Sequence, residues 1–106
     1  MAALNIPLPT PEKQFRFSIL LDNQKVEFVF RWNLTGQYWT FELTGQTLTD
    51  EVHGAAVVAG VDLLGPYAIR EMGQLYCLDT KDLNEDPDFD NFGTRWVMVY
   101  VEKSGV

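Results

Sequence analysis

Apolar and polar residues alternate with a period of two over the first part of the chain. Apolar side chains occupy every second position of one segment: Phe15, Phe17, Ile19 and Leu21. The next segment repeats the alternation with aromatic enrichment: Val26, Phe28, Phe30 and Trp32. These segments predict two half-buried strands joined by a turn at residues 22–24, since Asp and Asn tolerate turn geometry. A third strand is predicted over residues 38–44, which completes an antiparallel meander.

The middle of the chain is less regular. Residues 48–52 fit a short strand or a turn. Residues 55–59 are apolar or small throughout, which fits a strand covered on both faces or one short helical turn, and we favour the strand. Residues 62–67 then form a single helical turn or a bend that Gly65-Pro66 stops.

The last part of the chain predicts two strands around a long acidic loop. One strand covers residues 74–79, the acidic loop covers residues 79–92, and the final strand covers residues 94–102. Residues 96–101 are all apolar, so we expect the core to cover one face of this strand and another subunit to cover the other. The fold class is therefore all-β: a small antiparallel barrel or sandwich of about six or seven strands.

The length of 106 residues fits one domain with a modest core, which we place at residues 14–106. Residues 1–13 are predicted to form an extended N-terminal arm, because they contain Pro7, Pro9 and Pro11. Proline lacks an amide donor and restricts the residue before it, so this segment is poorly suited to a central strand. Such an arm either lies against a partner or is a frayed end.

The net charge is −7, and most of the acid excess lies in residues 79–90. Non-specific nucleic-acid binding requires Lys and Arg to neutralise phosphates, so we expect no nucleic-acid partner and no anionic membrane surface. A basic protein partner fits this charge. The chain has neither a signal-peptide pattern nor an apolar run near the roughly 20 residues of a membrane span, so we expect a soluble protein made in the cytoplasm.

Residues capable of catalysis or metal binding are few. His53, the single histidine, has no nucleophile signature beside it and is best interpreted as a loop residue. Cys77, the single cysteine, predicts a buried thiol and no disulfide within the chain. Asp86-x-Asp88-x-Asp90 opens like a calcium loop, but Asn91 and Val97 replace the required Gly and Glu. We therefore predict no enzyme, metal or cofactor, with weak calcium binding in another geometry left as an alternative.

Residues 57–67 combine an apolar run with two glycines and one carboxylate, Asp62. No neighbouring residue completes a reactive group, so we expect this block to serve a structural shape and a contact, not a reaction. Either Asp62 caps the amides of the following turn, with Leu63 and Leu64 in the core, or the block faces another protein. The candidate interface combines this block, the N-terminal arm and the acidic loop: Asp62, Leu63, Leu64, Tyr67, Ile6, Leu8, Asp86, Asp88 and Asp90.

Several motifs in a fixed order carry a family resemblance: Ile6-Pro7-Leu8-Pro9, Phe28-Val29-Phe30-Arg31-Trp32-Asn33, Gly36-Gln37-Tyr38-Trp39, Gly60-Val61-Asp62-Leu63-Leu64 with Tyr67, and Phe92-Gly93-Thr94-Arg95 within residues 90–101. The chain resembles the baseplate plug proteins of contractile-tailed phages, of the cyanophage type. The resemblance implies a structural protein of the virion tail that plugs or adapts between tail tube and hub or spike near the central axis. It also implies assembly in the host cytoplasm and a homo-oligomeric ring.

Two other functions stay open at this point. Trp32, Trp39 and Trp96 would serve a small β-barrel module that binds a ligand or carbohydrate, although the alternation favours the core for them. An enzyme that uses paired carboxylates is the third alternative, because the separation such a pair requires is spatial.

Overall fold

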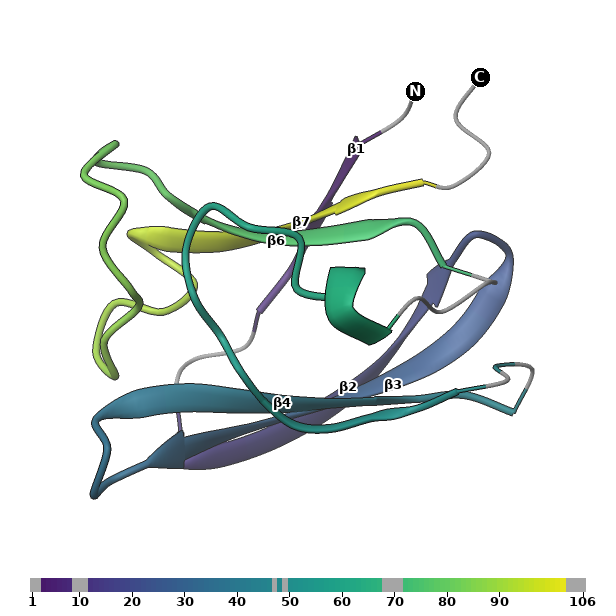
Figure 1. Cartoon of the computed structure of the whole chain (residues 1–106), viewed down its shortest axis with the longest axis horizontal. Helices are drawn as coiled ribbons and strands as arrows, with labels where there is room; N and C mark the ends of the chain where they lie inside the picture. The colour runs from purple at the N-terminus through teal and green to yellow at the C-terminus, as the bar shows by residue number, and fades with distance from the viewer. Residues whose placement is uncertain (1–2, 9–11, 47, 49, 68–71, 103–106) are drawn as a thin grey trace.

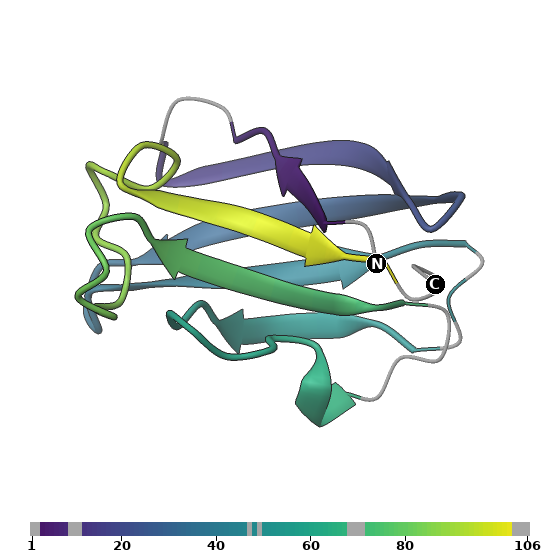
Figure 2. The same cartoon turned by 90° about the horizontal axis from the view of Figure 1, so that it is seen from above.

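Two antiparallel sheets form the protein. The structure, a computed structural model, describes residues 3–8, 12–46, 48, 50–67 and 72–102. The smaller sheet has the order β1 (Ala3–Ile6), β7 (Trp96–Val101), β6 (Gln74–Asp79). The larger sheet has the order β2 (Gln14–Leu21), β3 (Gln24–Asn33), β4 (Tyr38–Thr44), β5 (Val52–Ala56). They stack as two layers (Figure 1), with the three-stranded sheet lying over the four-stranded one (Figure 2). The predicted all-β fold is confirmed, in its sandwich form.

The first hairpin has the turn that the sequence predicts. Asp22 and Asn23 adopt φ angles of 51° and 62° between β2 and β3. Two central residues with positive φ are typical of a type I′ turn, whose twist matches that of the flanking strands. The pairing runs from Gln14 opposite Arg31 to Leu21 opposite Gln24, so the alternating aromatic positions of both strands face the core.

The core between the sheets is rich in aromatic side chains. The largest fully buried side chains include Trp39, Trp96, Tyr100, Phe28, Phe30, Phe41 and Phe92. The ring of Phe30 stacks on Phe15 at 5.3 Å and meets Phe92 edge-on at 5.5 Å. Trp32 is half-buried and packs edge-on against Trp39 at 5.4 Å. Large rings buried in this way supply much of the hydrophobic stabilisation of a small domain.

Part of the predicted N-terminal arm is a strand. β1 pairs with β7 from Ala3 opposite Val101 to Ile6 opposite Met98, at the edge of the smaller sheet. Pro7 follows directly, which fits the restriction of proline to sheet edges and strand ends. Pro9 and Pro11 lie outside the described residues.

The strand favoured at residues 55–59 is displaced towards the N-terminus, because β5 spans Val52–Ala56. Val57 still donates its amide to the Trp39 carbonyl at 2.8 Å, but Ala59 has already reached the other sheet and bridges Cys77. Val57 and Ala59 are both buried. An apolar run that crosses between two sheets resembles a buried strand in sequence, so the pattern could not locate the end of β5.

Two further boundaries differ from the prediction. The 3₁₀ turn η1 (Gly65–Tyr67) contains Gly65 and Pro66, the residues expected to stop a turn. Proline is tolerated in a first helical turn, where its missing amide has no partner to lose. β7 begins two residues later than predicted, because the amides of Thr94 and Arg95 both donate to the Asn91 carbonyl at 3.0 Å and hold a tight turn.

Candidate functional site

Residues 59–64 lie along the edge of β6 that β7 leaves open. The amide of Gly60 donates to the Cys77 carbonyl at 2.9 Å, and the amide of Leu63 donates to the Leu75 carbonyl at 2.7 Å. Exposed sheet edges are templates for unwanted pairing with other chains. This segment therefore protects the edge of β6 without forming a regular strand.

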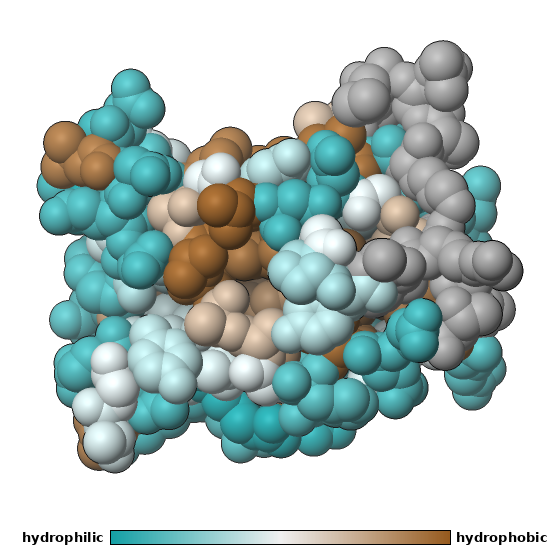
Figure 3. Space-filling view, in the orientation of Figure 1, coloured by the Kyte–Doolittle hydropathy of each residue, from teal (hydrophilic) through white to brown (hydrophobic). Residues whose placement is uncertain are grey.

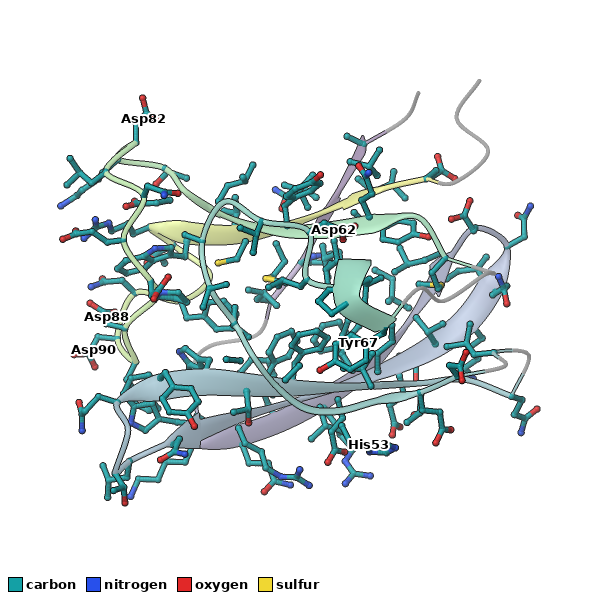
Figure 4. All side chains as sticks on the ribbon, in the orientation of Figure 1. His53, Asp62, Tyr67, Asp82, Asp88 and Asp90 are labelled. Atoms are coloured by element: carbon teal, nitrogen blue, oxygen red, sulfur yellow. The ribbon has the colours of Figure 1, made fainter. Side chains whose placement is uncertain are left out.

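Asp62 completes the covering of this edge and lies between β6 and η1 (Figure 4). Its Oδ1 accepts hydrogen bonds from the amides of Leu64 and Leu75, both at 3.1 Å. Leu63 and Leu64 are buried in the core, whereas Tyr67 is 37% exposed. These contacts favour Asp62 as an internal brace. The contact of this block with another protein stays a prediction, with Tyr67 as its exposed member.

The arm residues of the candidate interface lie mostly inward. Ile6 is buried in the core opposite Met98, and Leu8 is half-buried and packs against that core. A partner that contacts this region would therefore meet the backbone of β1 more than these two side chains.

Two indole groups hold the acidic loop to the sandwich. Trp39 Nε1 donates to the carbonyl oxygen of Asp88 at 2.9 Å, and Trp96 Nε1 donates to that of Glu85 at 2.8 Å. Buried tryptophan normally satisfies its single donor, and here the acceptors are loop carbonyls. Both tryptophans are thus core residues that also position the loop.

The three predicted loop carboxylates have different surroundings. Asp86 Oδ1 accepts from the amide of Ala59 at 3.0 Å, and Asp88 Oδ1 accepts from the amide of Asn91 at 2.8 Å. Asp90 is exposed. Within the described residues, no three Asp, Glu, His or Cys side chains converge as metal ligands. Figure 4 shows Asp82, Asp88 and Asp90 at the same end of the sandwich, which makes this end acidic.

An ion-pair network closes the base of the loop. Arg95 donates from Nε and Nη2 to the two carboxylate oxygens of Asp79, both at 2.9 Å, and from Nη2 to Glu85 Oε1 at 2.5 Å. The guanidinium carbon lies 4.2 Å from the ring centre of Trp96. The hydrogen bonds from Arg95 hold the pKa of Asp79 well below its usual value, and the Asp79 side chain is only 1% exposed. Sequence reasoning missed this network because residues 79 and 95 lie far apart in the chain.

This network predicts an acid dependence of stability. The ordinary pKa of Asp79 is 3.8 and the folded value is lower, so its contribution is complete above that pH and is lost as pH falls through the folded pKa. Arg95→Gln is expected to flatten the loss of stability between about pH 5 and about pH 2, measured by urea unfolding. Arg31→Gln, which removes an exposed pair with Glu42, should leave the slope unchanged. Identical slopes for wild type and Arg95→Gln would contradict the assignment.

His53 and Cys77 lie in different layers and form no nucleophile–base pair. His53 is exposed on β5, with Nε2 3.2 Å from Glu51 Oε1, and Figure 4 shows it on the side of the larger sheet away from Asp62. Cys77 is buried in the core, as predicted. Burial, aided by the charges of Asp86 and Asp79, raises the pKa of the thiol to about 12, and only the thiolate is strongly nucleophilic.

Folded protein at pH 8 is therefore expected to resist a disulfide-forming thiol reagent over a time in which the urea-unfolded chain reacts completely. The matched control moves the thiol by one position, in Cys77→Ala/Leu78→Cys, because Leu78 is 41% exposed. This variant should react at nearly the rate of the unfolded chain. Rapid reaction of folded wild type would show that the thiol is accessible.

Residues 3–103 match the family described as cyanophage baseplate Pam3 plug gp18. The chain belongs to this baseplate plug family. The matched region contains both sheets, the Asp62 segment and the acidic loop. The resemblance that the motifs indicated is thereby confirmed, and the family supports a structural role in the baseplate of a phage virion tail. No curated protein matches the chain.

The structure of this plug-family chain gives little support to the alternative of a ligand- or carbohydrate-binding module. A hollow of about 570 Å³ at one end of the larger sheet has no aromatic lining: Ser18, Lys25, Val26, Glu27, Thr44, Gly45, Gln46 and Glu51. Ligand sites are typically lined by apolar and aromatic side chains. Trp39 and Trp96 are buried, so the proposed tryptophan surface loses two of its three members.

Tyr100 is a second residue of the plug fold that sequence reasoning missed. Its hydroxyl donates to Asp22 in the β2–β3 turn and accepts from the amide of Gly73 at 2.6 Å. Burial is the first cause of the raised pKa of this hydroxyl. Tyr100 lies in an apolar run, so the sequence pattern did not indicate that its hydroxyl links the two sheets.

In the described part of the chain, no helix is long and apolar enough to cross a membrane.

Proposed function

We propose that the protein is a plug or adaptor near the central axis of the baseplate, linking the tail tube to the hub or spike. The match of residues 3–103 to the baseplate plug family carries this proposal. The protein works by contact, without turnover or cofactor. Its partners are tube, hub or spike proteins, not nucleic acid or membrane. Its copies form a homo-oligomeric ring that assembles in the host cytoplasm.

The surface chemistry supports a role in contact. The exposed predicted interface residues include carboxylates at the loop end of the sandwich: Asp86, Asp88 and Asp90. These charges suit a basic rim on a neighbouring protein, and high salt would weaken such an attachment because exposed charges are screened.

Electron cryomicroscopy of purified tails tests the proposal, with an affinity-tagged copy of this chain to assign its density. We expect density for the chain on the axis, between tube and hub or spike, in several symmetry-related copies. Density at the periphery of the baseplate would overturn the axial position while leaving a structural role. Absence of the chain from purified tails, checked by mass spectrometry, would overturn both.

A further inference from the structure

The outward face of the smaller sheet is mostly apolar. Successive residues of a strand point to opposite faces, so the residues that alternate with the buried Met98 and Cys77 point away from the core. These outward positions on β6 and β7 are Gln74, Tyr76, Leu78, Val97, Val99 and Val101, and Gln74 is the one polar residue among them. On β1, the polar residue Asn5 lies opposite Val99 on the same face. All six positions on β6 and β7 are half-buried or exposed, and Figure 3, which views this sheet from its edge, shows apolar patches among polar ones on the rim above these strands. This agrees with the prediction from the sequence that both faces of the last strand are apolar.

The outward face of the larger sheet has the opposite character. Charged and hydroxyl side chains predominate on it: Arg16, Ser18, Lys25, Glu27, Arg31, Thr40, Glu42 and Thr44. Arg31 and Glu42 pair across β3 and β4 at 2.6 Å. One face of an antiparallel sheet is usually polar where water covers it. The larger sheet follows this rule and the smaller sheet does not, so the smaller sheet is the better candidate for a contact face.

An acidic hollow lies at one end of the apolar face. It measures about 210 Å³ and is lined by Gly60, Leu78, Asp79, Asp82 and Asn84. A β-carbon on Gly60 would lie 2.5 Å from Asn84 Oδ1, so a larger residue there would crowd the hollow.

The carboxylate of Asp82 lies at the rim of this hollow, and Figure 4 shows its side chain at the outer tip of the loop. Arg95 already neutralises Asp79, whereas no ion pair to the carboxylate of Asp82 is present among the described residues. Leu78 belongs to both the apolar face and the hollow, so the two are continuous. A molecule that covers the apolar face and also reaches the hollow therefore needs a cation next to its apolar side chains.

We propose that this face binds a neighbouring baseplate protein through an apolar segment followed by a Lys or Arg, whose cation lies at the rim of the hollow beside Asp82. The proposal rests on the proposed function and names the chemistry of the partner. A second copy of this chain fits less well, because each copy carries a net charge of −7 and the hollow itself is acidic.

Photo-crosslinking tests the proposal in assembled tails. A benzoylphenylalanine replaces Val99 at the centre of the face in one variant, and Ser18 on the polar sheet in the control. We expect the probe at position 99 to crosslink to an apolar segment of a different baseplate protein, with Lys or Arg within a few residues. Crosslinks to a second copy, to a segment without a cation, or only from position 18 would overturn the proposal.

Detection of the chain and its crosslinking variants in purified tails separates failure of the docking face from failure of the plug function. If the chain is present in tails and position 99 captures no partner, the docking face is wrong and the plug function survives. If the unsubstituted chain is absent from tails, the plug function itself fails. If only the position-99 variant is absent although it unfolds like wild type in urea, the substitution has blocked the docking face.

The hollow is tested with a synthetic peptide that covers the crosslinked partner segment. Asp82→Asn removes the charge and suits the φ of 60° at this position, because Asn tolerates left-handed backbone. It should weaken peptide binding about fivefold at low salt. Asp90→Asn, the matched neutralisation outside the hollow, should leave affinity within about 1.5-fold. Equal effects of the two substitutions would show that only the general charge of the loop matters.

Discussion

Replacing Trp39 by Ala is expected to lower the free energy of unfolding by about 3–5 kcal/mol, the range for large aromatic side chains deleted from a core. Trp39 is fully buried and its ring lies 5.0 Å from that of Phe92 and 5.7 Å from that of Phe89. The substitution leaves a cavity between the larger sheet and the acidic loop, and it removes the donor to the Asp88 carbonyl. Urea unfolding followed by far-ultraviolet circular dichroism measures the loss.

Two further variants separate the contributions at this site: Trp39→Phe tests the hydrogen bond, and Trp32→Ala tests the effect of burial. Trp39→Phe keeps an aromatic ring but not the indole donor, so it should lose less stability than Trp39→Ala. Trp32→Ala deletes the same side chain from a half-buried position and should cost clearly less than Trp39→Ala. Equal losses from Trp32→Ala and Trp39→Ala would contradict the central place given to Trp39.

Replacing Asp62 by Ala is expected to lower the free energy of unfolding by about 2–4 kcal/mol, because two backbone amides lose their acceptor. These amides belong to Leu64 and Leu75, and both residues are buried. Thermal and urea unfolding measure the effect. Near-wild-type stability together with failure to enter tails would instead identify Asp62 as a contact with another protein.

Asp62→Asn provides the matched variant, since it keeps an oxygen at the accepting position without the charge. It should retain a large part of the stability that Asp62→Ala loses. Asp90→Ala, at an exposed position of the acidic loop, should change stability by less than about 0.5 kcal/mol.

The first hairpin shows how far local pattern leads. Alternation in residues 15–21 and 26–32 located two strands and their inward faces, and the Asp22-Asn23 turn followed from turn chemistry. The alternation and the turn residues each depend on a few neighbouring positions, so a single sequence is enough to identify them. The same reasoning placed a strand at residues 55–59 where β5 spans Val52–Ala56, because an apolar run indicates burial but not which element covers it.

The candidate site was predicted less completely than the fold. The apolar run of the last strand indicated that its outer face needs a partner, and the acidic loop indicated a basic one. The hollow beside Leu78 was beyond prediction, because Gly60 and Asp82 approach each other only through the path of the segment along β6. The brace formed by Asp62 likewise depends on Leu75, which lies 13 residues away in the chain.

The sequence by itself determined that this protein is an all-β sandwich or barrel, that its aromatic residues form the core, and that it belongs with the baseplate plugs. These features depend on alternation, turn residues and ordered motifs, which are local. Only the tertiary structure decided how Trp39 holds the acidic loop across 49 residues and how Tyr100 joins Asp22 across 78 residues. Such contacts depend on how two sheets stack, and stacking is a property of the whole chain.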